Sequence, residues 1–216
     1  MDTKPSKLDT SDNLCVIGRS QFVARETAAI ELEYSVGQAP LAKGARLWLL
    51  ADIRQIPGSF QATHPDQPGY VRASASGGQS LCVTCPGEGR PGELVRTLDL
   101  LPAVPEFLHV VEVLIDDRPL ASGDAVRFEI GGHAGWMVPR HAIDSFHFWI
   151  IADRGGDWRF ELSDGKYHNF IPARGDLALP SPICASISVL PGPPTRLDAV
   201  IPSSHRQGQL NPLRVR

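Results

Sequence analysis

Short stretches in which hydrophobic and polar residues alternate run through most of this chain. Ile30, Leu32 and Tyr34 are apolar, for example, and Glu31 and Glu33 stand between them. Successive side chains on a β-strand point to opposite faces of the sheet, so a period of two is typical of a half-buried strand and not of a helix. This alternation is the strongest constraint on the fold, and it predicts an all-β protein.

Similar segments recur at nearly even spacing, with turn residues between them. Gly supplies the positive φ that tight turns need and Asp bonds its own backbone, so these residues between two strands indicate hairpins. Such turns are expected at residues 116–117, 122–124, 154–157 and 163–165. Many short strands with these turns predict an antiparallel β-sandwich with polar, frayed ends, and helix could occupy at most residues 94–101. Further strands are expected at residues 46–51, 70–75, 80–84, 94–100, 109–115, 125–130, 145–152, 158–162, 185–190 and 197–201.

The length and the distribution of polar residues predict one main domain. A chain of 216 residues that is 42% hydrophobic can bury a sizeable core. Residues 1–20 are expected to form a flexible N-terminal segment, and residues 21–192 the sandwich. A proline-rich stretch at 190–194 interrupts the strand pattern, because proline offers no donor to a β-ladder. Residues 193–216 are then expected to begin a further β-module or a C-terminal extension.

Charge and hydrophobicity argue against two classes of partner. The 21 Lys and Arg residues nearly balance the 24 Asp and Glu residues, so no basic field favours nucleic acid. No stretch approaches the ~20 apolar residues needed to cross a bilayer, which argues against a membrane partner. The first 13 residues also lack the apolar segment of a secretory signal. We therefore expect a cytoplasmic protein.

One cluster of residue types could bind a metal. His133, His141, His147 and Asp153 are ligands that a divalent metal such as Zn uses, and a catalytic site would need three of them to converge. No motif of known metal-ligand spacing such as H-E-x-x-H is present, and the pattern does not bring these residues to one point. The preferred interpretation is therefore that His147 is a half-buried sheet residue, that the others are polar loop residues and that the chain has no cofactor, and a divalent metal is the alternative.

Cysteines and tryptophans offer two further candidate sites. Cys82 and Cys85 have C-x-x-C spacing but no second pair, so simple packing of reduced thiols is the expected role. Trp residues could form a platform that stacks on sugar rings, although a buried Trp is the commoner outcome in a sandwich. Trp136 is the expected exception and the candidate ligand-binding residue, because it lies in a Gly-rich loop.

Several segments together resemble a known family. The chain is similar to the N-terminal β-rich region of large bacterial proteins of a domain-of-unknown-function family. Members of this family continue into a domain similar to polymerase-and-histidinol-phosphatase metallohydrolases. The present chain ends at Arg216, before any such domain, so no catalytic residue is carried over from the resemblance. The segments that carry it are residues 34–37, 64–71, 120–124, 130–132, 135–139 and 191–197.

These observations predict a non-catalytic accessory module. Its expected role is docking or substrate presentation, and its expected partner is a metallohydrolase-like domain or protein. A C-terminal strand edge could in addition lead to self-association, because unpaired edges pair with one another. Two alternatives stay open: a small metal-dependent hydrolase that uses the His and Asp residues above, and a carbohydrate-binding module that works through Trp136.

Overall fold

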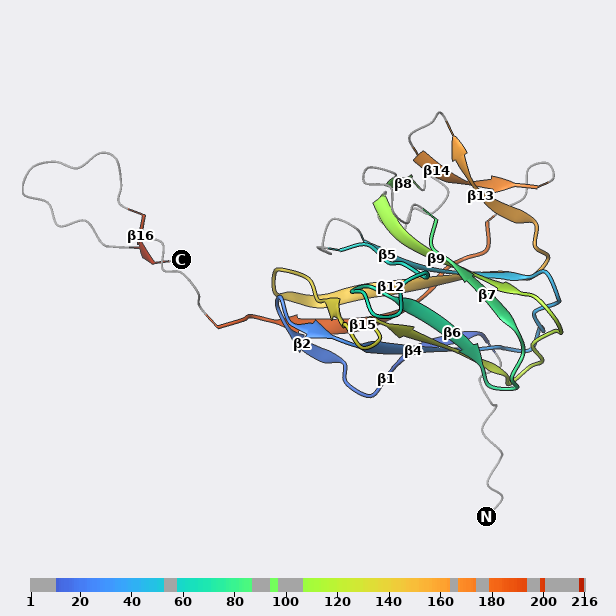
Figure 1. Cartoon of the computed structure of the whole chain (residues 1–216), viewed down its shortest axis with the longest axis horizontal. Coiled ribbons are helices and arrows are strands. Elements are labelled where there is room, and N and C mark those ends of the chain that lie inside the picture. The colour runs from blue at the N-terminus through green and yellow to red at the C-terminus, as the bar shows by residue number, and fades with distance from the viewer. Residues whose placement is uncertain are drawn as a thin grey trace, which may run out of the picture.

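The computed structural model of this protein describes residues 11–52, 58–86, 94–96, 107–163, 167–173, 179–193, 199–200 and 214–215. Within these ranges every regular element is a β-strand (Figure 1). The predicted all-β sandwich is therefore confirmed. Among the described residues, no helix has the length and apolar character that a membrane span requires.

The smaller sheet has four antiparallel strands in the order β1-β4-β10-β6. Its inner face carries buried side chains such as Leu32 and Phe128. Its outer face carries charged residues that form ion pairs across the strands, including Arg72 with Glu129. This is the alternation seen in the sequence. The strands are β1 (Asn13–Ile17), β4 (Ile30–Ser35), β10 (Ala125–Ile130) and β6 (Val71–Ala75).

The larger sheet has nine strands in the order β13-β14-β8-β9-β5-β12-β15-β2, with β7 paired to β9. All neighbours are antiparallel except β14 with β8 and β15 with β2. The strands are β13 (Trp158–Ser163), β14 (Tyr167–Pro172), β8 (Leu94–Arg96), β9 (Phe107–Ile115), β5 (Arg46–Asp52), β12 (Ile143–Asp153), β15 (Ile183–Leu190), β2 (Gln21–Val23) and β7 (Leu81–Thr84). Two further two-stranded sheets join β11 (Trp136–Met137) to β3 (Thr27–Ala28) and β16 (Ala199–Val200) to β17 (Arg214–Val215).

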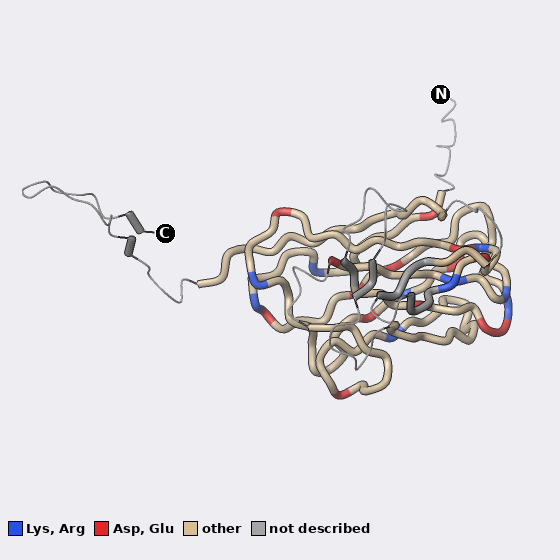
Figure 2. The backbone as a smooth tube through the Cα atoms, turned by 90° about the horizontal axis from the view of Figure 1, so that it is seen from above, with Lys and Arg blue, Asp and Glu red and all other residues tan. Residues whose placement is uncertain are grey.

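The two large sheets pack face to face and enclose the main core. Leu32 from the smaller sheet and Leu49 and Phe148 from the larger sheet belong to one buried cluster. The edges of the two sheets are also close together, because β1 of the smaller sheet lies beside β15 of the larger one, and β6 lies beside β7. Acidic and basic residues are interspersed over this body (Figure 2), in line with the small net charge of −3.

The larger sheet has a second apolar cluster on its other face. Trp48 and Leu50 of β5 point away from the main core and pack with Ile151 and with Trp158 of β13. As a result β5 is buried on both faces over six successive residues. A strand buried on both faces gives a continuous hydrophobic run, which is why this segment lacks the alternation of β4.

The predicted hairpins are correct at one turn and wrong at three. Residues 163–165 do separate the paired strands β13 and β14, although residues 164–166 lie outside the described part. Residues 116–117 and 122–124 instead connect β9 of the larger sheet to β10 of the smaller one. Residues 154–157 connect β12 to β13, which are not neighbours in the sheet. Turn chemistry reverses the chain locally, whereas the pairing partner depends on burial between distant segments.

The first strand of the domain lies closer to the N-terminus than expected. β1 falls within residues 1–20, the segment expected to be flexible, but it pairs with β4 along its whole length. The sheet therefore begins before residue 21, and residues 1–10 lie outside the described part. At the other end, β16 and β17 lie within residues 193–216. The division into domains, and self-association through a C-terminal edge, stay predictions.

Acidification from pH 7 to pH 4 is expected to remove up to about 3 kcal/mol of stability through His109. Its ring centroid lies 5.4 Å from that of Phe60, and its Nε2 atom is buried with no hydrogen-bond partner. Burial lowers the pKa of His109 from 6.5 to about 4, against an opposing effect of the Asp52 carboxylate.

The unfolded chain therefore takes up a proton before the folded protein does. The stabilisation is complete above about pH 6.5 and is lost as the pH falls towards 4. Urea unfolding at pH 7, 5.5 and 4 measures this loss, and His109→Gln should remove this part of the pH dependence. An identical pH profile for both proteins would contradict the assignment.

Candidate functional site

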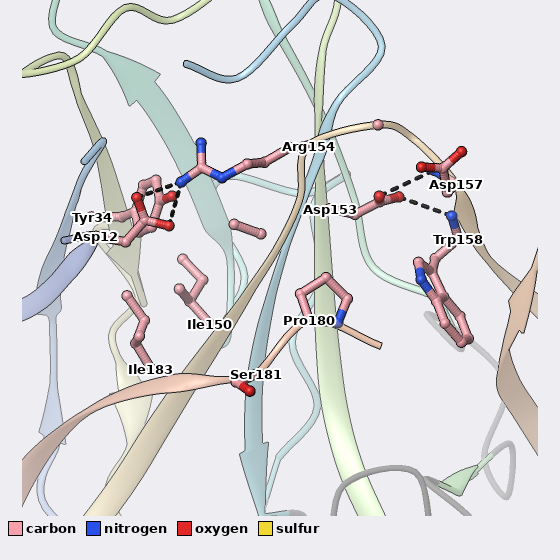
Figure 3. Close-up of a pocket in the computed structure, with 12 residues that line it drawn as sticks. Asp12, Tyr34, Ile150, Asp153, Arg154, Asp157, Trp158, Pro180, Ser181 and Ile183 are labelled. Atoms are coloured by element: carbon pink, nitrogen blue, oxygen red, sulfur yellow. Dashed lines mark hydrogen bonds and ion pairs between the residues drawn. The ribbon is translucent and has the colours of Figure 1, made fainter. Parts of the chain in front are cut away.

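A cavity of about 340 Å³ lies where β12 ends and the chain turns towards β13 (Figure 3). We call it the end pocket. β12 and the following turn supply one side of it, and Tyr34 of β4 and the approach to β15 supply the other. The end pocket is lined by Asp12, Tyr34, Ile150, Ala152, Asp153, Arg154, Gly155, Asp157, Trp158, Pro180, Ser181 and Ile183.

Asp153 organises the turn beneath the end pocket. Its side chain is buried, and the residue is only 2% exposed. One carboxylate oxygen accepts a hydrogen bond from the backbone N–H of Asp157 at 3.1 Å, and the other accepts one from the backbone N–H of Trp158 at 2.9 Å. The Asp157 carboxylate packs closely over Gly155, since a Cβ there would lie 2.1 Å from Oδ2 of Asp157 unless this carboxylate moved. Residues 153–157 thus form a turn that is capped by its own aspartate.

Arg154 connects three segments at the rim of the end pocket. One guanidinium nitrogen bonds both carboxylate oxygens of Asp12, and another reaches the carbonyl oxygens of Ala39 and Pro40. Asp12 in turn accepts a hydrogen bond from the backbone N–H of Gly37 at 2.8 Å. The charges of Arg154 and Asp12 therefore compensate each other, and the pair attaches the chain before β1 to the β12–β13 turn.

Tyr34 places a buried hydroxyl in the wall of the end pocket. The residue is 0% exposed, and its hydroxyl is buried beside Asp12 and Arg154, although it makes no hydrogen bond of ordinary geometry to either. Burial, together with the nearby Asp12 carboxylate, raises the pKa of Tyr34 well above its usual value. The hydroxyl is therefore protonated near neutral pH and can both donate and accept a hydrogen bond. Nearly all buried polar groups in proteins have a partner, so this one is a candidate contact for a bound molecule.

The end pocket combines negative charge with an apolar wall. Three carboxylates, from Asp12, Asp153 and Asp157, face one guanidinium, which leaves a formal charge of −2. Ile150, Ile183 and Pro180 form the apolar part of the lining. Chemically, the site can accept hydrogen bonds and cover an apolar group at the same time.

The four predicted metal ligands are not brought together. His133 is exposed and lines a separate surface hollow of about 400 Å³ with Tyr70 and Glu129, and His141 is also exposed. His147 and Asp153 lie six residues apart on β12, which separates their Cα atoms by about 20 Å. In the part of the chain that the structure describes, no group of three or more His, Cys, Asp or Glu side chains could hold a metal ion.

The expectation that the Gly-rich loop exposes Trp136 is wrong. The residue is 1% exposed and packs in the core with Phe60, Phe146 and Phe148, with ring centroids 6.1 Å apart in each pair. Gly131 adopts a φ of +102°, which turns the loop so that β11 pairs with β3 at the edge of the core. The indole face is therefore not available to a sugar.

Most residues of the end pocket were missed by the sequence analysis. Residues 154–157 were interpreted only as a turn, Asp153 as a metal ligand, and Tyr34 only as a strand residue that shares a face with Ile30 and Leu32. One signal was present: the alternation places Tyr34 on the buried face, and a buried tyrosine hydroxyl needs a hydrogen-bond partner. The neighbours Asp12 and Arg154 are 142 residues apart in the sequence, so only the fold could bring them together.

Comparisons with known proteins show no family. No protein-family model and no curated protein matches this chain. Among solved structures, AvmM, which catalyses macrocyclization in alchivemycin A biosynthesis, is similar at 13% identity and a TM-score of 0.40, over 87% of this chain and 93% of that one. A cohesin module from a Clostridium perfringens family 33 glycoside hydrolase is similar at 8% identity and a TM-score of 0.38, over 85% and 99%. Neither likeness carries an inference about function.

Proposed function

We propose that this chain is a non-catalytic accessory β-sandwich module that holds a ligand or a partner segment in its end pocket. The larger protein that it serves would be metallohydrolase-like, as the sequence resemblance implies, and the module would act in the cytoplasm by docking or by presenting substrate. The observation that carries this proposal is the hydroxyl of Tyr34, which is buried in the wall of the end pocket beside Asp12 and Arg154 and makes no hydrogen bond of ordinary geometry.

The energetics of that hydroxyl support a binding role. A buried hydroxyl without a partner costs about 1–3 kcal/mol. Packing alone would be served as well by phenylalanine, which fills nearly the same space without a polar atom. A ligand or partner segment that bonds the hydroxyl would recover the lost hydrogen bond. The hydroxyl thus stabilises the bound state more than the free protein.

Tyr34→Phe tests this argument directly. Without a ligand, the variant is expected to be as stable as the native protein or more stable, by up to about 1 kcal/mol, because it removes an unpaired buried hydroxyl. Urea unfolding monitored by tryptophan fluorescence measures the difference, and Tyr70→Phe, at a half-buried tyrosine outside the end pocket, is the matched control. A loss of more than 1 kcal/mol in Tyr34→Phe alone would show that the hydroxyl already has a partner within the protein, and would overturn the argument.

The accessory role has its own test. The chain is mixed with the metallohydrolase-like domain of a protein from the family that it resembles, and hydrogen exchange is measured with and without that domain. We expect slower exchange in residues 150–158, and no hydrolysis of p-nitrophenyl phosphate by the chain alone with Zn²⁺ or Mn²⁺ present. Turnover by the chain alone, or exchange that the domain leaves unchanged, would contradict this role.

A second candidate function, carbohydrate binding, is favoured by an aromatic pair on the outer face of β12. His147 stacks on Trp149 with ring centroids 5.6 Å apart and an interplanar angle of 23°. The pair stands beside the exposed residues Cys184 and Ser186 of β15. The candidate aromatic residue is therefore Trp149 and no longer Trp136. Soluble glycans should quench tryptophan fluorescence in the native protein but not in Trp149→Ala, and equal quenching in both would exclude this site.

A further inference from the structure

We propose that the surface hollow on the outer face of the smaller sheet binds a neutral disaccharide. This inference goes beyond the proposed function, because the described residues that line the hollow differ from those of the end pocket. The volume of about 400 Å³ is within the usual range for small-ligand sites. We call this cavity the sheet hollow, and the lining residues that carry the inference are Glu31, Pro65, Tyr70, Arg72, Glu129 and His133.

The loop before β6 forms one wall of the sheet hollow, and a buried side chain holds its shape. Gln61 is 7% exposed. Its side-chain nitrogen donates to the carbonyl oxygens of His64 and Gln67, and its side-chain oxygen accepts from the backbone N–H groups of Thr63 and His64. The amide of Gln61 thus bonds four backbone groups of one loop, and this fixes the loop in a single shape.

The loop after β10 forms the facing wall and is joined to the first loop. The backbone N–H of Gly131 donates to the carbonyl oxygen of Tyr70 at 2.7 Å, and that of Gly69 donates to the carbonyl oxygen of Gly135 at 3.1 Å. The sheet hollow is therefore formed before any ligand arrives. A preformed site loses little free energy to the ordering of loops when it binds.

Tyr70 and Pro65 supply the apolar part of the sheet hollow. Tyr70 is half-buried, and its ring lies over Gly132, since a Cβ there would be 3.4 Å from Cδ1 of the ring. The Pro65 carbonyl oxygen lies 3.5 Å from the same position, so both residues stand at one place. A sugar ring presents C–H groups on its faces, and an aromatic ring is the surface against which these groups pack.

The charges of the sheet hollow are compensated, which favours a neutral ligand. Nε and Nη2 of Arg72 donate to the two carboxylate oxygens of Glu129 at 2.8 and 2.7 Å. Nη1 of Arg127 lies 3.8 Å from a carboxylate oxygen of Glu31. Each carboxylate thus has a guanidinium beside it. An anion or a cation would have to compete with these internal pairs, whereas a hydroxyl group would not.

The polar side chains form one row across the outer face of the sheet. Glu129 of β10 lies opposite Glu31 of β4 and opposite Arg72 of β6. Glu129 raises the pKa of Arg72 most strongly, and Tyr70 and Glu31 raise it further, so the phenol also lies near this row. Like charges directly opposite each other destabilise a sheet. The stability of the sheet alone therefore does not explain why Glu31 faces Glu129.

This row can bond the hydroxyl groups of a sugar. A carboxylate accepts several hydrogen bonds and a guanidinium has five N–H donors, so acceptors and donors remain beside the Arg72–Glu129 pair. Neighbouring hydroxyl groups can donate to a carboxylate and accept from Arg72 at the same time. Two inter-strand spacings of about 4.8 Å separate the ends of the row, which makes it about 10 Å long. This length corresponds to a disaccharide and exceeds a single sugar ring.

Matched probes on the full chain test this inference. Binding of cellobiose, maltose, methyl β-glucoside and glycerol is measured by chemical-shift titration. We expect millimolar binding of at least one disaccharide, severalfold weaker binding of methyl β-glucoside, and at least tenfold weaker binding of glycerol, which has neighbouring hydroxyl groups but no ring. Added salt should change the affinity less than twofold, because the ligand is neutral. Absence of binding by both disaccharides, or equal binding of disaccharide and glycerol, would overturn the inference.

Variants locate the site. With the disaccharide that binds more tightly, Tyr70→Ala is expected to weaken binding at least tenfold, and Tyr70→Phe should bind more tightly than Tyr70→Ala because it keeps the ring. Arg72→Gln should weaken binding severalfold, whereas Arg140→Gln makes the same change in net charge at another exposed position and should leave binding unchanged. Urea unfolding shows whether each variant is folded. Equal affinity in Arg72→Gln and Arg140→Gln would overturn the assignment to the sheet hollow.

The positions of the shifted residues separate this inference from the other candidate sites. We expect the disaccharide to shift residues 70–72 and 129–133. Shifts confined to residues 147–149 would overturn the assignment and would support the aromatic pair of His147 and Trp149 instead. Shifts confined to residues 150–158 would also overturn it and would place the sugar in the end pocket. Failure at the sheet hollow leaves the proposed function to its own tests, because these use Tyr34 and the metallohydrolase-like domain.

Discussion

Trp136→Ala is expected to lower the free energy of unfolding by about 3–5 kcal/mol. The indole is 1% exposed and contacts Phe60, Phe146 and Phe148, which come from different parts of the chain. Its removal leaves a cavity that these rings cannot fill without leaving their own positions. The loss of apolar burial and the cost of the cavity therefore add.

Urea unfolding measured against a neighbouring control checks this prediction. Met137→Ala changes the next residue of β11, which is 42% exposed, and should alter stability by no more than about 0.5 kcal/mol. If Trp136→Ala were as stable as Met137→Ala, the indole would not be part of the core, and a surface role in binding sugars would have to be considered again.

Gly131→Ala is expected to cost about 2–4 kcal/mol, since two separate penalties apply. Gly131 has a φ of +102°, a conformation in which any Cβ is strained. A Cβ there would also lie 2.7 Å from the backbone nitrogen of Trp136 and 2.9 Å from the carbonyl oxygen of Ala28. These are backbone atoms of the β11–β3 pair, so relief of the clash would require this pairing to shift.

Gly123→Ala separates the two penalties. Gly123 has a similar φ of +88°, but no atom lies within 4 Å of the position that its Cβ would take. This variant should therefore lose only the conformational part, about 1 kcal/mol. Thermal and urea unfolding of both variants give the comparison. Equal losses would mean that the close approach of β3 and β11 to Gly131 is not present in solution.

Much of the fold could be predicted from the sequence, because its strands follow local rules. The alternation at Ile30 to Tyr34 corresponds to β4, and the segment 125–130 corresponds to β10 with the same bounds. Two of the shortest elements were not predicted. β3 and β11 have two residues each, too few to show a period of two.

The candidate site could be predicted only in part. The sequence singled out residues 154–157 as a turn and placed Asp153 in a metal cluster, whereas the fold directs both carboxylate oxygens of Asp153 to backbone donors. His147, from the same cluster, stacks on Trp149 on the outer face of β12. The residue types indicated that metal binding was chemically possible. They did not indicate that these side chains would already form hydrogen bonds or ring contacts within the protein.

The sequence by itself determined the class of the fold, the position of most strands and the buried face of alternating strands such as β4 and β10, because side-chain direction depends on neighbouring residues. Only the tertiary structure decided which strands pair, that β5 is buried on both faces, that Trp136 lies in the core, and that Asp12, Tyr34 and Arg154 meet in one pocket. These outcomes depend on contacts between residues far apart in the chain. Such contacts are selected by the total burial and hydrogen bonding of the whole fold, and no local pattern specifies them.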